Sequence, residues 1–281
     1  MQVGKYQVHL IDTGRYRLDG GAMFGVVPQV LWKKKNPPDE KNRIFMALNT
    51  LLLKAPGRNI LIDTGIGDKS TEKFRDIYGI DHSRHSLLKA LAAHKIQPEN
   101  VTDVILTHLH FDHVGGATYY DKEGRLSLRF PHATHYVQKK QLEWAQKRFE
   151  KDHASYLSEN IDPLVKSDNL KILDGPRALF DGVELILSDG HTIAQQLVLV
   201  FGEKEKLCYA ADLIPMTAHI NIPWVMAYDL YPVTTIQEKK ELLGRAVREN
   251  WMVFFEHDPE VCCGTIEETD KGFGLKKAIK L

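Results

Sequence analysis

The chain has 281 residues, with 37 Lys and Arg against 37 Asp and Glu, and 43% of its residues are hydrophobic. A formal net charge of zero excludes a protein held on nucleic acid or an anionic membrane by its overall charge. No stretch approaches the roughly 18 apolar residues of a membrane span, and the N-terminus lacks the apolar region of a signal peptide. Three cysteines without a CxxC motif argue against a disulfide framework. We therefore expect a cytoplasmic protein.

Short apolar runs that end in turn residues predict strands in the first part of the chain. One of these runs ends at Asp63-Thr64-Gly65. Leucines at helical spacing then predict a helix, which is followed by another buried strand. The expected strands are residues 8–11, 45–53, 58–62 and 101–106, and the expected helix is about 83–93.

A charged amphipathic stretch of about 139–159 predicts further helices, after which apolar runs return. No low-complexity linker or change in composition divides the chain, so we expect a single domain over residues 1–281. Strands with interspersed helices fit helices packed on two sheets. The later expected elements are strands 183–188, 196–201, 206–211 and 251–256, the last clear strand, and a helix of about 236–249.

A dense group of metal-binding residue types follows the strand expected at 101–106, where the chain reads HLHFDH over residues 108–113. His108 and His110 end an extended segment and point to the same side, and a tight loop then brings Asp112 and His113 into the same cavity. Imidazole and carboxylate suit a borderline divalent ion, above all zinc. Polar groups crowded at a partly buried loop are costly unless they are paired, so this run predicts a metal site.

Three more residues of metal-binding type stand directly after apolar strands, where α/β active sites collect. They are His191 after 183–188, Asp212 after 206–211 and His257 after 251–256. We expect them to complete the site.

The run at 108–113 resembles the HxHxDH signature of the metallo-β-lactamase-fold superfamily. Gly190-His191, Asp212 and His257 follow in that family's order and rough spacing, and Asp63-Thr64-Gly65 matches its early turn. The likeness covers nearly the whole chain. It implies an α/β fold, a four-layer αββα sandwich with a helical insertion around 136–170, and a two-metal site at one edge.

The resemblance also implies a ligand set. His108, His110 and His191 would hold the first metal ion, Asp112, His113 and His257 the second, and Asp212 would bridge them. Asp63 resembles the family's carboxylate that orients a metal-bound imidazole. We interpret the other histidines as structural or surface residues: His9, His82, His85, His94, His132, His135, His153 and His219.

Two such ions, Zn²⁺ first and Fe or Mn as alternatives, would hold a bridging water as hydroxide near neutral pH. This favours a metal-dependent hydrolase in which Asp112 and Asp212 are catalytic, Asp112 as a proton shuttle besides its role as a ligand. Flavodiiron-type relatives carry Glu where this chain has His110, which argues for zinc-type hydrolysis over oxygen reduction.

The stretch at 135–145 resembles the helical insertion of the quorum-quenching lactonases, which organophosphate-hydrolysing relatives share. The predicted substrate is a small ester-like molecule, a lactone first, with aryl esters, phosphotriesters and glyoxalase II-type thioesters as alternatives. Several apolar residues could line the mouth of the site, although ordinary core packing is the favoured interpretation of any one of them. They are Met23, Phe24, Phe111, Trp224 and Met226.

The chain departs from the lactonase branch at two places. The Tyr that those enzymes carry three residues after the bridging Asp is here Pro215, so Tyr228 would have to replace it. The family's GHTPGH loop reads GHTIAQ over residues 190–195, which keeps the ligand histidine and loses the second one. These changes weaken the lactonase assignment and leave the metal ligands intact.

Two hypotheses belong to other classes. A mononuclear iron oxidoreductase of the persulfide dioxygenase type would use a two-His-one-carboxylate site, which the intact second ligand set disfavours. A binding protein that merely retains the fold would have lost ligands, and none is missing. We expect a small-molecule substrate, no nucleic acid and no membrane partner, and leave open whether the chain forms a homodimer.

Overall fold

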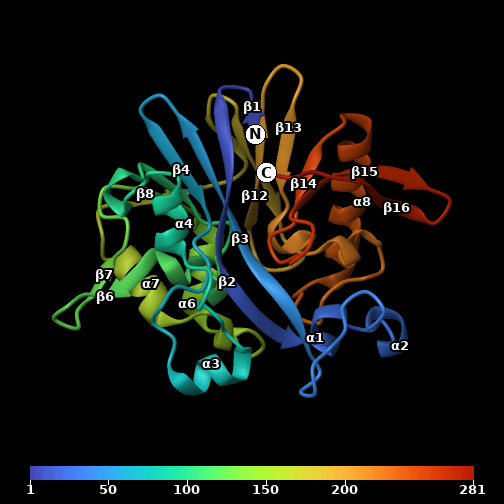
Figure 1. Ribbon diagram of the computed structural model, residues 1–281, viewed down its shortest axis with the longest axis horizontal. Helices are drawn as coiled ribbons and strands as arrows, with labels where there is room; N and C mark the ends of the chain where they lie inside the picture. The colour runs from blue at the N-terminus through green and yellow to red at the C-terminus, as the bar shows by residue number, and fades with distance from the viewer. The chain divides into compact units, whose positions relative to one another are not determined.

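The computed structural model describes residues 1–281, and it divides into two compact units (Figure 1). Unit 1 comprises residues 1–2, 6–15 and 48–175, and unit 2 comprises residues 3–5, 16–47 and 176–281. Each unit is built on one seven-stranded sheet and has its own helices, which confirms the predicted α/β class. The expectation of a single domain stays a prediction.

The sheet of unit 1 has the order β1-β2-β3-β4-β5-β8-β9. Strands β4, β5, β8 and β9 are parallel, so their carboxyl ends meet at one edge. Ile62 pairs with Ile105, which brings Asp63 and Thr107 together at that edge. The strands are β1 (Gln2–Val3), β2 (Tyr6–Asp19), β3 (Arg43–Ala55), β4 (Arg58–Ile62), β5 (Asp103–Ile105), β8 (Thr134–Gln138) and β9 (Leu170–Leu173), and the chain of β2 and β3 continues into unit 2.

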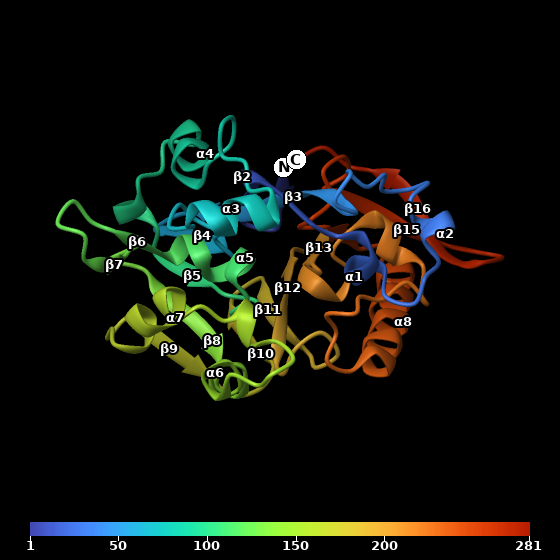
Figure 2. The same cartoon turned by 90° about the horizontal axis from the view of Figure 1, so that it is seen from below.

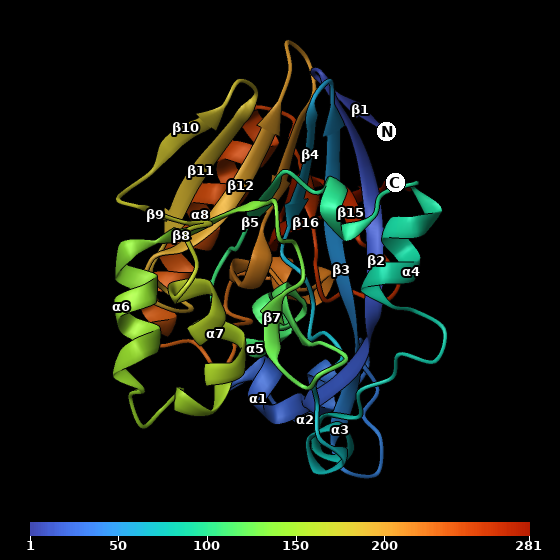
Figure 3. The same cartoon turned by 90° about the vertical axis from the view of Figure 1, so that its left-hand side faces the viewer.

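Short helices complete unit 1, and two of them form the predicted insertion. α6 contacts β8, and α7 contacts the small hairpin of β6 and β7 (Figure 3). α3 begins where the Thr71 hydroxyl accepts a hydrogen bond from Phe74 N, and it ends at Gly79 in the left-handed conformation. The elements are α3 (Glu72–Tyr78), α4 (Leu87–Ala93), η1 (Pro98–Asn100), α5 (Phe111–Val114), η2 (Gly115–Ala117), β6 (Thr118–Tyr120), β7 (Leu126–Leu128), α6 (Lys139–Lys147), η3 (His153–Ser155) and α7 (Ser158–Val165).

The sheet of unit 2 has the order β10-β11-β12-β13-β14-β15-β16. Because β12 is antiparallel to both β11 and β13, and β13 is parallel to β14, the strands β11, β13 and β14 run in one direction and end at one edge. The three predicted ligands of this unit follow these ends. The strands are β10 (Arg177–Phe180), β11 (Val183–Ser188), β12 (Gln195–Phe201), β13 (Lys206–Tyr209), β14 (Met252–Phe254), β15 (Cys263–Thr269) and β16 (Gly272–Ala278).

The hairpin of β15 and β16 corrects the expectation that the strand at 251–256 is the last. The first half of β15 is mostly buried, but its last three residues are exposed, and β16 is partly or fully exposed throughout. The apolar signal of a two-sided buried strand is therefore missing from the sequence at this place.

Unit 2 also contains one long helix, α8 (Pro232–Arg248), which contacts β15 (Figures 1 and 2). It begins four residues before the expected 236, with Pro232 in the first turn, where no backbone N–H is needed. None of the helices is long and apolar enough to cross a membrane. The remaining helices are α1 (Gly20–Phe24), α2 (Gln29–Trp32), η4 (Ala211–Leu213) and η5 (Thr217–Ile220).

Candidate metal centre

Four of the predicted ligands form one buried cluster in unit 1, composed of His108, His110, Asp112 and His113 (the unit 1 cluster). His108 Nε2 lies 3.0 Å from His110 Nδ1, and His113 Nε2 lies 3.9 Å from Asp112 Oδ2. All four residues are at most 7% exposed. Buried imidazoles and a carboxylate are donors that suit a divalent metal ion.

Asp63, directly after β4, supports this cluster. Its Oδ1 accepts a hydrogen bond from Thr107 N–H at 2.7 Å, and its Oδ2 accepts one from the Thr107 hydroxyl at 2.6 Å. The same Oδ2 lies 3.0 Å from His113 Nδ1. A carboxylate only accepts, so His113 donates through Nδ1 and turns Nε2 toward Asp112. This is the arrangement that orients a metal-bound imidazole.

The Asp63–Thr107 pair also fixes His108. The one proton of the Thr107 hydroxyl is donated to Asp63, so its oxygen can accept from His108 Nδ1, which lies 3.1 Å away. His108 Nε2 is then the nitrogen that faces the cluster.

The turn after β4 packs closely against the backbone that follows the cluster. Thr64 donates to His113 O through both its N–H and its hydroxyl, each at 2.8 Å. A Cβ on Gly116 would lie 2.2 Å from Thr64 O, and one on Gly115 would lie 2.1 Å from Ile66 O. Glycine is required at both positions because the two backbones approach so closely.

The helical insertion contributes two contacts to the unit 1 cluster. Gln141 of α6 is fully buried, and its Oε1 accepts a hydrogen bond from Leu109 N at 3.4 Å. The ring of Tyr156, which lies between η3 and α7, has its centroid 4.8 Å from that of His110. The insertion therefore helps to fix the histidine motif.

The other three predicted ligands, His191, Asp212 and His257, form a buried cluster in unit 2 (the unit 2 cluster). Asp212 Oδ2 lies 3.1 Å from His191 Nε2, and Asp212 Oδ1 lies 3.1 Å from His257 Nε2. One carboxylate thus faces two imidazoles, one through each oxygen. A bridging carboxylate between two metal ions would use its oxygens in the same way.

Both histidines of the unit 2 cluster are oriented through Nδ1. His191 Nδ1 donates to Asp229 Oδ1 at 2.9 Å. His257 Nδ1 donates to Ala47 O at 3.0 Å and lies 3.2 Å from the Tyr16 hydroxyl. Pro215, which stands in the place of the lactonase Tyr, accepts a hydrogen bond from His257 N at 2.9 Å.

Two carboxylates surround His191. Burial by itself would lower the pKa of this imidazole, but Asp212 and Asp229 outweigh burial and raise the pKa to about 9. The position therefore favours a bound cation, whether a proton or a metal ion.

Phe111 belongs to a group of three aromatic side chains, of which it alone was predicted from the sequence. Its ring centroid lies 5.1 Å from that of Phe74 and 4.9 Å from that of Tyr78, and these two rings lie 4.5 Å apart. Burial and the Asp112 carboxylate both raise the pKa of Tyr78. Phe74 and Tyr78 lie four residues apart on one face of α3, a helical spacing that could have pointed to them.

The other residues suggested for substrate contact lie in unit 2. Met23, Phe24 and Met226 are buried in its core, and Phe24 stacks on Trp32 and on His219, with ring centroids 5.3 and 5.0 Å away. Tyr228 is partly exposed and lies in the loop before Asp229. Trp224 lines a pocket of about 620 Å³ together with Phe45 and Phe273.

His219, which we expected to be structural, is fully enclosed. Its Nε2 donates to Met23 O at 2.8 Å, and burial together with the charge of Lys239 lowers its pKa to about 4. Asp229, by contrast, was not singled out in the sequence, since it stands in a loop without a preceding apolar strand.

Solved structures share this fold over the whole chain. A probable metal-dependent hydrolase from Staphylococcus aureus matches with a TM-score of 0.86 and 28% identity, covering 100% of both chains. AidC, a dizinc quorum-quenching lactonase, matches with a TM-score of 0.79 and 23% identity, covering 100% of this chain and 97% of the other.

Sequence comparison identifies relatives with named activities. An N-acyl homoserine lactonase from Bacillus cereus is 27% identical over 221 residues, which is 74% of this chain and 80% of the relative. N-acyl homoserine lactonase AiiA from Bacillus thuringiensis subsp. kurstaki is 25% identical over the same shares of the two chains. The family model of the metallo-β-lactamase superfamily matches residues 44–257, a range that contains every predicted metal ligand. The chain belongs to the metallo-β-lactamase superfamily.

Proposed function

We propose that this chain is a zinc-dependent hydrolase that opens lactones, and that the seven predicted ligands bind two zinc ions. Asp212 is the proposed bridging ligand. Asp112 is the proposed proton shuttle.

The observation that carries this proposal is the orientation of four histidines. His108, His113, His191 and His257 each engage an acceptor of their own unit through Nδ1, and each turns Nε2 toward another predicted ligand. Metal-binding histidines are oriented in this way: the acceptor is a carboxylate or a backbone carbonyl for His113, His191 and His257, and it is the Thr107 hydroxyl for His108. A chance group of buried histidines has no reason to repeat it four times.

The side chains present fit two zinc ions. Five imidazoles and two carboxylates, all at most 7% exposed, suit zinc in their chemistry. When bound, two zinc ions polarise an ester carbonyl and lower the pKa of a water molecule to near neutrality. Asp112, whose carboxylate lies 3.9 Å from His113 Nε2, would take a proton and return it to the leaving oxygen.

The aromatic group of Phe74, Tyr78 and Phe111 supports an ester with an apolar acyl part. Phe111 immediately precedes Asp112 in the chain, and Phe74 and Tyr78 are only partly buried. The three rings therefore offer an apolar surface beside a predicted ligand, and such a surface binds a hydrocarbon chain by the hydrophobic effect. Named lactonases among the relatives point to the same substrate class.

The proposal is tested by metal analysis and lactone hydrolysis on one preparation, purified without added metal. We expect near two zinc ions per chain, and ring opening of N-acyl homoserine lactones that a chelator abolishes and zinc restores. His110→Ala should lose metal and activity together. His132→Ala changes an exposed histidine outside the clusters and should retain both.

Other outcomes separate the alternatives. One iron ion per chain would overturn the hydrolase and direct assays to oxygen consumption with thiol substrates. Two zinc ions with hydrolysis of aryl esters or phosphotriesters, but not of lactones, would reject the lactone and keep the dinuclear site.

A further inference from the structure

We infer that Glu238 and Lys239, consecutive residues of α8, are positioning residues that hold the ligand His191 by fixing the two loops that contact it. The inference concerns the backbone frame around His191, and its importance for metal binding rests on the proposed function.

Lys239 stands where an apolar residue belongs. The buried positions of α8 follow helical spacing, and Lys239 is fully buried in this stripe while its other members are Thr235, Leu242, Leu243 and Ala246. A lysine in a core stripe is costly unless its nitrogen is hydrogen-bonded. Its presence there calls for a specific set of partners.

Those partners are three backbone carbonyls of one loop. Lys239 Nζ donates to Asn221 O at 2.9 Å, to Ile222 O at 3.2 Å and to Trp224 O at 2.7 Å. Within this loop Asn221 O also accepts a hydrogen bond from Trp224 N at 3.0 Å, and the lysine attaches all three carbonyls to α8.

The fixed loop leads to the support of His191. Met226 N donates to Asp229 Oδ2 at 3.3 Å, and the other oxygen of Asp229 accepts from His191 Nδ1 at 2.9 Å. Leu230 N donates to His191 O at 3.0 Å. A shift of residues 221–226 would therefore displace both the carboxylate that orients the ring and the amide that holds its backbone.

Glu238 fixes the loop on the other side of His191. Its carboxylate accepts hydrogen bonds from the Ser188 hydroxyl at 2.7 Å, from Asp189 N at 2.8 Å and from Gly190 N at 3.2 Å. Gly190 also packs directly on α8, since a Cβ there would lie 2.5 Å from Thr235 N. The two residues before His191 are thus attached to the same helix as the loop that supports its ring.

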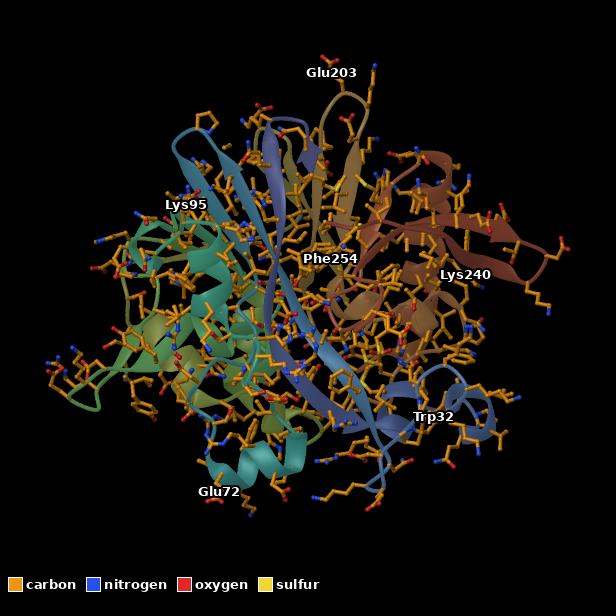
Figure 4. The ribbon with its side chains drawn as sticks, viewed as in Figure 1. Trp32, Glu72, Lys95, Glu203, Lys240 and Phe254 are labelled. Atoms are coloured by element: carbon orange, nitrogen blue, oxygen red, sulfur yellow. The ribbon has the colours of Figure 1, made fainter.

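The next two residues of α8 provide matched controls. Lys240 and Glu241 are exposed, and Figure 4 labels the side chain of Lys240. Lys239→Met and Lys240→Met remove the same charge from neighbouring positions, and Glu238→Gln and Glu241→Gln form the second pair. Only the first member of each pair contacts a loop beside His191.

The first measurement is hydrogen–deuterium exchange of the metal-free protein. Amides whose protection depends on a local opening exchange faster when that opening becomes easier. We expect Lys239→Met to accelerate exchange in residues 224–231 and Glu238→Gln to accelerate it in residues 189–191, each by about tenfold or more. Lys240→Met and Glu241→Gln should match the unchanged protein.

The second measurement is zinc affinity, by competition with a chelator. Loss of groups that orient a ligand typically weakens metal binding by about 10- to 100-fold. We expect a loss in this range for Lys239→Met and Glu238→Gln, and less than a twofold change for the two controls.

Each outcome decides a separate statement. Unchanged exchange in both test variants overturns the inference, whatever the enzyme's activity. Faster exchange with unchanged zinc affinity overturns the positioning role and leaves a structural one. If the protein binds no metal, the proposed function is wrong. Hydrogen–deuterium exchange then still tests whether Glu238 and Lys239 fix the two loops that contact His191.

General loss of stability is checked separately. Leu243→Ala shortens an apolar side chain on the same buried face and leaves Glu238 and Lys239 unchanged. It should lower the melting temperature without the local increase in exchange. If Lys239→Met does not fold, Glu238→Gln decides the inference by the same two measurements.

Discussion

His191 Nδ1 lies 2.9 Å from Asp229 Oδ1, and both side chains are buried in unit 2. The carboxylate fixes the ring orientation and makes the other nitrogen a stronger donor to a metal ion.

Asp229→Asn should therefore weaken zinc binding by about 10- to 100-fold, because the amide keeps the shape and loses the charge. Zinc competition with a chelator measures the change, and Asp270→Asn, at an exposed position, is the control. Equal zinc affinity in the two variants would show that Asp229 does not support zinc binding.

Asp63→Ala should lower the free energy of unfolding of the metal-free protein by about 2–4 kcal/mol, because Thr107 and His113 would lose a buried charged acceptor. The backbone of Asp63 has φ 57°, in the left-handed region, and its side-chain bonds compensate for that conformation. Urea unfolding tests this against Asp168→Ala on the surface. A loss no larger than that of the surface variant would contradict the prediction.

His135 should make the protein sensitive to acid. Its imidazole is fully buried, and burial lowers the pKa of this histidine from 6.5 to about 4, against a smaller opposing effect of the Ala133 backbone. Its contribution to stability is present above pH 6.5 and is lost as the pH falls toward 4. The loss is at most about 3.5 kcal/mol, since one pKa unit is about 1.4 kcal/mol.

His135→Leu should reduce this loss between pH 6.5 and 4, as followed by urea unfolding at several pH values. His132→Gln, at an exposed position, should leave the pH dependence of stability unchanged. If both variants show the pH dependence of the original protein, another group is responsible for it.

The aromatic group of Phe74, Tyr78 and Phe111 should determine acyl-chain preference. Phe74→Ala removes one face of the apolar surface, so KM for a ten-carbon acyl lactone should rise about tenfold, the equivalent of about 1.4 kcal/mol. KM for a four-carbon substrate should change little. Phe149→Ala, an exposed ring in the insertion, is the control, and parallel changes for both substrates would argue against an acyl contact.

Most of the strands, and the candidate ligands that cluster within each unit, could be predicted because both depend on local sequence. An apolar run followed by His or Asp indicates a buried strand that ends at a site, as at β5, β13 and β14. Two features were not predicted because their local sequence signals are weak. The partly exposed hairpin of β15 and β16 has no buried-strand pattern, and α3 contributes Phe74 and Tyr78 through packing on Phe111.

The sequence by itself determined the family, the α/β class and the seven candidate ligands, because residue type and spacing along the chain are sufficient for these. Only the tertiary structure decided what holds the ligands. Asp229 is 38 residues from His191, and Asp63 is 50 residues from His113. In the sequence, Lys239 is a charged residue at an apolar position of a helix. Only the structure shows that its nitrogen donates to the carbonyls of residues 221, 222 and 224. Strand order and loop packing bring such partners together, and no local sequence pattern indicates which residues will meet.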